Sequence, residues 1–97
     1  MPAYLVVNYD VTDADAYLDY QTKAGPILTN GTLLVLDPAS TAVEGEPGHQ
    51  TVIIEYPTRE LAEAAYHSDE YQAVVGIRHG AIANGRAVIV DGFAPPS

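Results

Sequence analysis

The chain contains no cysteine and no tryptophan, and cationic side chains are scarce. Without cysteine it can form neither a disulfide framework nor a zinc–thiolate site, and it has no thiolate nucleophile. Thirteen acidic residues and only four lysines and arginines give a formal net charge of −9 over 97 residues. So few cations cannot neutralise a phosphate backbone, and we therefore expect no nucleic-acid partner. We interpret the acidity as a solvated surface that keeps the protein in solution.

Long apolar runs are also missing. No segment approaches the length of a membrane span, and the start, Met1-Pro2-Ala3-Tyr4, lacks the basic flank of a signal peptide. We therefore expect no membrane partner and a cytoplasmic location. The length predicts a single domain over residues 1–93, and residues 94–97 are expected to form a flexible C-terminal tail.

Several motifs that carry known chemistry are absent as well. There is no G-x-G-x-x-G or P-loop for a nucleotide, and no serine-centred nucleophile elbow for acyl transfer. The three histidines, His49, His67 and His79, stand at no metal-ligand spacing. We therefore expect neither a metal site nor a cofactor.

What the sequence does contain is a regular order of apolar strands and capped helices. Runs of β-branched and apolar residues predict four strands, at 3–9, 32–36, 51–56 and 86–91. A helix is expected over 14–28, where Gly25-Pro26 should kink it or end its regular part. A second helical region begins after Thr58, and Ser68 is expected to start a new helix, which splits this region in two.

This order of elements predicts the α+β ferredoxin-like βαββαβ fold, with helices on one face of a four-stranded antiparallel sheet. Leu5, Val6 and Val7 are consecutive and apolar, which predicts a central first strand with both faces buried. One set of helices covers only one face of the sheet. We therefore expect the other face to meet the same face of a second copy in a two-fold homodimer.

The same segments resemble a known family. Its motifs are E-Y-P-T-R-E at 55–60, H-S-D-E-Y-Q-A at 67–73, the Arg78 that follows, and V-I-V-D-G at 88–92. With the order of elements, they make the chain similar to domain-of-unknown-function family 1330, within the dimeric α/β-barrel superfamily. The resemblance spans nearly the whole chain and implies fold and dimerisation more than chemistry. Asn30-Gly31-Thr32 departs from the frequent Gly-Gly-basic segment of relatives, and Ala65 stands where a tryptophan is common.

Related families in the superfamily include cofactor-independent monooxygenases of polyketide quinones, muconolactone-type isomerases, haem proteins and stress-responsive barrels. By this resemblance, the chain is expected to be a cofactor-independent small-molecule enzyme of monooxygenase or isomerase type, acting on a hydrophobic or aromatic substrate. The alternative is a non-catalytic dimeric module that binds a small ligand or serves in a stress response. The fold does not decide between them, because one barrel hosts unrelated chemistries.

Polar residues on the predicted strands are the first candidates for a site. Asn8 and Tyr4 share one face of the first strand, and Glu55 lies on the third. If these faces line the space between the sheet and the partner subunit, they would present polar groups in an otherwise apolar cavity. A buried Glu55 would hold its proton more tightly than in water and act as a general acid or base. Alternatively, Glu55 pairs with Arg59 or Arg78, or caps backbone groups at the strand end.

His49 is the best placed of the histidines. It begins the third strand, which in an antiparallel sheet lies near the end of the first strand and so near Asn8. Glu55 and His49 are therefore the predicted catalytic residues, with a surface histidine as the alternative for His49. Tyrosine is in excess, with seven residues against one phenylalanine; most are expected in the core, and Tyr20 is the first candidate to line a pocket. The predicted substrate-binding residues are Asn8, Tyr20, Tyr4 and Arg78.

Overall fold

A computed structural model describes residues 1–94 of the chain. Of the predicted tail, residues 95–97 lie outside the described part. The elements follow one another as β1 (Ala3–Val11), α1 (Ala14–Ala24), β2 (Thr32–Asp37), β3 (Gln50–Tyr56), α2 (Arg59–His67), α3 (Asp69–Ala81) and β4 (Ile82–Asp91).

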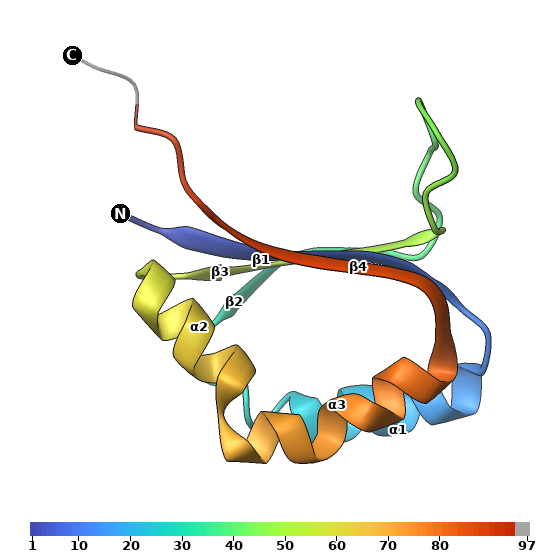
Figure 1. The fold of residues 1–97 in the computed structure, drawn as a ribbon, viewed down its shortest axis with the longest axis horizontal. Helices are drawn as coiled ribbons and strands as arrows, with labels where there is room; N and C mark the ends of the chain where they lie inside the picture. Colours follow the sequence, from blue (N-terminus) through green and yellow to red (C-terminus); the bar gives the residue numbers. More distant parts are fainter. Residues whose placement is uncertain (95–97) are drawn as a thin grey trace.

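The four strands form one antiparallel sheet in the order β2-β3-β1-β4, and the helices α1, α2 and α3 lie on the same side of it (Figure 1). β1 takes the interior position that its apolar run predicts. α2 packs on the sheet, whereas α1 and α3 pack mainly against each other. The predicted ferredoxin-like α+β fold, with its second helical region split into α2 and α3, is confirmed.

The side chains of β1 alternate between an inner face, under the helices, and an outer face. Ala3, Leu5, Val7 and Tyr9 are buried on the inner face, whereas the residues between them are only half-buried. The prediction that both faces of β1 are buried therefore holds, in a single chain, for the inner face alone. The register places on the outer face Tyr4, Val6 and Asn8 of β1, Thr51, Ile53 and Glu55 of β3, and Arg86, Val88 and Val90 of β4.

Side-chain caps fix where the helices begin. Asp13 at the start of α1 and Thr58 at the start of α2 each accept the backbone N–H three residues on, at 3.1 and 3.2 Å. Ser68 accepts the Tyr71 N–H at 3.2 Å and donates to the Ala65 carbonyl at 2.9 Å. One side chain thus ends α2 and starts α3, as the sequence predicts.

The largest differences from the predicted boundaries are at the end of α1 and the start of β4. α1 ends at Ala24 and not at 28; its regular part thus stops at Gly25-Pro26, one of the two outcomes expected there, because Pro26 has no N–H to donate to the helical ladder. β4 begins at Ile82 instead of 86. Asn84 adopts the left-handed conformation, with φ of 58°, and donates to the Glu46 carbonyl at 3.1 Å, so the strand continues through this position. Among residues 1–94, no helix combines the length and apolar character required to cross a membrane.

Candidate functional site

A cavity of about 300 Å³ lies between the inner face of the sheet and helices α1 and α3. Most of its wall is apolar and comes from the sheet and α1. Leu33 and Leu36 of β2 line one side and are 55% and 48% exposed. The deeply buried polar residues of the wall are Tyr9, Tyr17, Tyr20, Tyr71 and Arg78. The cavity therefore has an apolar open end and a polar buried end.

Helix periodicity explains how these polar groups converge. Tyr17 and Tyr20 are three residues apart on α1, and Tyr71 and Arg78 are seven apart on α3. Both intervals return side chains to the same face of a helix. Tyr9 comes from the inner face of β1, directly opposite them. The two helices and the central strand thus supply one cluster.

The tyrosine hydroxyls of the cluster form two close pairs. The Tyr9 and Tyr17 oxygens are 2.6 Å apart, and those of Tyr20 and Tyr71 are 2.5 Å apart. The rings of both pairs meet edge to face, with centroids 5.7 and 6.3 Å apart. Because each pair uses only one hydroxyl hydrogen, one O–H in each pair remains to donate elsewhere.

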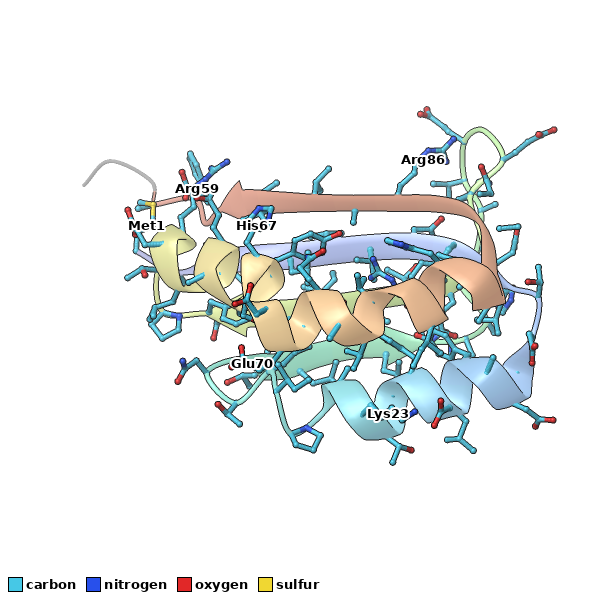
Figure 2. All side chains as sticks on the ribbon, turned by 60° about the horizontal axis from the view of Figure 1, so that its bottom comes forward. Met1, Lys23, Arg59, His67, Glu70 and Arg86 are labelled. Atoms are coloured by element: carbon cyan, nitrogen blue, oxygen red, sulfur yellow. The ribbon has the colours of Figure 1, made fainter. Side chains whose placement is uncertain are left out.

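Arg78 lies between the two pairs. It is only 4% exposed, and its Cζ is 5.7 Å from the ring centroids of both Tyr9 and Tyr20. Its Nε has no hydrogen-bond partner among the described residues, and the ion pairs found there do not include Arg78. The other three cations of the chain, Lys23, Arg59 and Arg86, are exposed, and all three are labelled in Figure 2.

A buried guanidinium without a carboxylate is costly. Desolvation of a buried ion costs on the order of several kcal/mol, and a cation–π contact returns about 0.5–2 kcal/mol. An arginine cannot lose its proton to escape this cost. The fold alone therefore leaves Arg78 under-compensated, which makes it a candidate for function.

Burial keeps Tyr9, Tyr20 and Tyr71 of the cluster neutral. It raises the pKa of Tyr9 and the pKa of Tyr20 far above that of a free tyrosine, and the hydroxyl paired with each raises it further. Burial also raises the pKa of Tyr71. At neutral pH these hydroxyls are donors and not tyrosinate counter-ions for Arg78. The buried end therefore presents one cation and neutral O–H donors, a combination suited to an oxyanion.

The structure brings two of the six predicted site residues together. Tyr20 and Arg78 both line the cavity, with the guanidinium over the tyrosine ring. Their roles in binding stay predictions. Within residues 1–94, no group of three or more His, Asp or Glu side chains is placed to hold a metal ion.

Asn8 and His49 lie at the junction of β1 and β3, outside the cavity wall. The Asn8 side chain donates to the Gly48 carbonyl at 3.0 Å and accepts the Gly48 N–H at 2.7 Å. His49 Nε2 accepts the Val11 N–H at 3.0 Å, and Nδ1 lies 2.9 Å from the Pro38 carbonyl, an arrangement that places the ring proton on Nδ1. The expected proximity of His49 to Asn8 is present, and both side chains are engaged with backbone groups.

Tyr4 and Glu55 are register partners on the outer face, away from the cavity. The Glu55 carboxylate raises the pKa of the Tyr4 hydroxyl, first through hydrogen bonding. Glu55 forms no ion pair among the described residues. Arg59, one of the partners expected for it, pairs instead with Glu63 at 3.2 Å and with Asp91 at 3.3 Å. Glu55 therefore meets a ligand only where another molecule lies against the outer face.

The sequence places most tyrosines in the core and puts Tyr20 first for the pocket, so it does not single out Tyr9, Tyr17 and Tyr71 as members of this cluster. A signal for Tyr71 was present, because its seven-residue interval to Arg78 places both on one helix face. No comparable signal identifies Tyr9, whose face depends on which side of β1 the helices cover.

The fold and the cavity define a ferredoxin-like α+β domain with an internal, amphipathic cavity. The chain belongs to the family described as Domain of unknown function (DUF1330), whose pattern matches residues 2–93. The family expected from the sequence motifs is thereby confirmed. No curated protein matches the sequence.

Solved structures share this fold at low sequence identity. A protein of unknown function from Rhodopseudomonas palustris is 17% identical, with a TM-score of 0.78 over 97% of this chain and 84% of that chain. SnoaB, a cofactor-independent oxygenase from Streptomyces nogalater, is 7% identical, with a TM-score of 0.66 over 97% and 95%. A dimeric ferredoxin-like protein of unknown function from Thermobifida fusca is 13% identical, with a TM-score of 0.62 over 92% and 89%. At these identities the likeness establishes the fold and not an activity.

Proposed function

We propose that the protein binds a small, predominantly apolar molecule in the cavity between the sheet and helices α1 and α3. The observation that carries the proposal is the volume of about 300 Å³, apolar at its open end and polar at its buried end. Ligand sites have volumes of about 300–1,000 Å³ and combine apolar walls with a few placed polar groups. A volume at the lower end of this range favours a ligand of one or two rings.

The small size of the domain strengthens this interpretation. Protein interiors are close-packed, and few of their voids exceed a water molecule. A cavity this large, which opens to solvent beside Leu33 and Leu36, leaves inner-face side chains without packing partners. An apolar ligand supplies those partners.

The test is calorimetric titration with 2-naphthamide, a neutral two-ring probe, into wild type, Leu36→Trp and Leu18→Trp. Leu36 lines the cavity, whereas Leu18 is 61% exposed on α1 and lies outside the wall, which makes it a matched control. Wild type and Leu18→Trp should bind alike, and Leu36→Trp should bind about tenfold more weakly or worse, because the indole narrows the opening. Equal binding by all three proteins would place the probe elsewhere and reject the proposal.

A catalytic role is the second candidate, favoured by the donors at the buried end. A guanidinium and neutral tyrosine hydroxyls stabilise the oxyanion of an enolate, and SnoaB, which shares the fold, is a cofactor-independent oxygenase. Monooxygenase or isomerase chemistry without a cofactor requires such an anion from the substrate itself. The cavity wall contains no carboxylate or imidazole to take the proton, and binding therefore stands first.

The catalytic candidate is tested by enolisation of 2-tetralone in D2O, with deuterium incorporation followed by NMR. A catalytic cavity should accelerate exchange over buffer at the same pH by about tenfold or more, and Arg78→Met should lose the acceleration. Equal exchange with and without the protein would remove this candidate and leave binding.

We also propose that the protein forms a homodimer through the outer face. Val88 and Val90 are 53% and 40% exposed there, and the half-buried Val6 and Ile53 lie beside them in the register. No described helix covers this side of the sheet (Figure 1). A second copy would remove this apolar surface from water.

A further inference from the structure

Arg78 is the one cation that the described fold buries, and no carboxylate is buried with it. Among residues 1–94, and apart from the tyrosines, the buried polar or charged side chains are Gln50 and Arg78. Gln50 is neutral, and the ion pairs of the described residues form between other side chains. The positive charge therefore lacks a counter-charge inside the fold.

The hydrogen-bonding capacity around Arg78 is also unused. A guanidinium carries five N–H donors and no acceptor, and the buried Nε has no partner in the described part of the chain. The pairs Tyr9–Tyr17 and Tyr20–Tyr71 each keep one O–H free after their mutual hydrogen bond. The groups at the buried end are therefore mainly hydrogen-bond donors that lack an acceptor among the described residues.

The tyrosines do not supply the missing negative charge. Burial raises the pKa of Tyr9 and the pKa of Tyr20, so both hydroxyls remain protonated at neutral pH. Their rings contact the guanidinium through their faces, which satisfies part of its charge but none of its N–H groups. Among residues 1–94, therefore, no group neutralises the guanidinium.

We propose that the cavity binds its ligand as an anion: a one- or two-ring molecule whose carboxylate, or ionised enol or phenol, lies against Arg78 while its rings extend toward Leu33 and Leu36. The inference rests on the proposed function of this cavity. A carboxylate matches the guanidinium fork through two parallel N–H donors, and the free hydroxyls of the two tyrosine pairs complete its coordination. A single phenolate or enolate oxygen meets the same donors.

The charge of the whole chain restricts the ligand further. A net charge of −9 repels anions at long range. Affinity therefore depends on the contact with Arg78 and on burial of apolar rings, which excludes small hydrophilic anions as the preferred ligands.

The test compares 2-naphthoate with 2-naphthamide, which share rings and size and differ in charge. Calorimetry on wild type at neutral pH should show 2-naphthoate binding about tenfold more tightly or better, the range that charge-assisted hydrogen bonds give. Arg78→Met should abolish the preference, and Arg78→Lys, which keeps the charge and loses the fork, should retain part of it. Arg86→Met, which removes an exposed cation outside the cavity wall, should leave the preference unchanged.

A carboxylate ligand is distinguished from an ionised phenol or enol with 4-nitrophenol, whose ionised form absorbs visible light. If wild type, but not Arg78→Met, generates the phenolate spectrum at a pH well below the pKa of the free probe, the anion class includes acidic phenols and enols. If wild type prefers 2-naphthoate to 2-naphthamide but binds 4-nitrophenol in its neutral form, the anionic ligands of the cavity are carboxylates. Both results support an anionic ligand.

Equal affinity of wild type for 2-naphthoate and 2-naphthamide would overturn the inference, and so would a preference that both Arg78 variants retain in full. In that case, weaker binding of 2-naphthamide by Leu36→Trp would still support the cavity as an apolar site. Failure of wild type to bind either probe would reject the proposed function itself. Circular dichroism of each variant establishes that it is folded, and the lysine variant decides the outcome where the methionine variant does not fold.

Discussion

Replacement of Arg78 by methionine should stabilise the ligand-free protein. The side chain is 4% exposed, and within residues 1–94 its Nε has no partner and no carboxylate is buried beside it. Methionine fills a similar length with a flexible apolar chain, so it keeps most of the packing and removes the charge. Replacement of a large buried residue usually lowers the free energy of unfolding, and we expect the opposite at this position.

The expected change in the free energy of unfolding is the difference between two opposing contributions. The substitution removes the desolvation cost of a buried ion, on the order of several kcal/mol. It also removes the contacts of the guanidinium with the rings of Tyr9 and Tyr20, about 0.5–2 kcal/mol each. The difference is a gain of about 1–3 kcal/mol in the free energy of unfolding, comparable with replacement of other buried ionic groups by apolar ones. In a domain of this size, each kcal/mol moves Tm by roughly 4–8 °C.

Urea unfolding followed by far-UV circular dichroism measures this gain, at one protein concentration because association adds to apparent stability. Arg86→Met is the control, since Arg86 is exposed and its loss should change the free energy of unfolding by less than about 0.5 kcal/mol. Destabilisation of Arg78→Met by more than about 1 kcal/mol would show that the ligand-free fold satisfies the guanidinium. That result would refute the reasoning that leads to an anionic ligand.

Three further substitutions test parts of the structure outside the cavity wall. Gly48→Ala should lower the free energy of unfolding by more than about 3 kcal/mol, because the alanine Cβ would lie 2.1 Å from the carbonyl carbon of Tyr9. Thermal unfolding at an unchanged temperature would contradict this close approach. His49→Phe should cost about 1 kcal/mol through the lost acceptor of the Val11 N–H, without weakening 2-naphthamide binding; weaker binding at unchanged stability would instead support a role for His49 in the site. Val88→Lys should convert a dimer into a monomer in light scattering, since it places a charge on the apolar outer face; a monomeric wild type would reject the proposed dimer.

The fold was predictable because its local signals agree with one another. Asp13, Thr58 and Ser68 cap the helices that follow them, and the apolar runs between them have the lengths of strands. The start of β4 was not predictable, because Ile82 joins the sheet by pairing with Val11, far away in the sequence. Such pairing overrides the local pattern that favours a loop.

The faces of the strands were harder to assign than the strands themselves. On β3, the inner set contains Gln50, Val52 and Ile54, and the outer set ends at Glu55. Both sets mix polar and apolar residues, so the alternation does not say which one faces the helices, and a shift of one residue exchanges them. This ambiguity explains why the sequence singles out Glu55, which the structure places on the outer face.

The sequence names Arg78 as a substrate-binding residue but does not predict its burial, because arginine is rarely buried and its place on the inward stripe of α3 contradicts its residue type. Sites where local rules fail are often functional, and three such features coincide at this end of the cavity: a buried cation without a counter-charge among residues 1–94, an Nε without an acceptor there, and a ligand-sized volume of about 300 Å³. Each alone has an ordinary explanation in stability or packing, but those explanations are independent of one another. One apolar anion neutralises the charge, accepts the donors and fills the volume, and it therefore accounts for all three with a single cause.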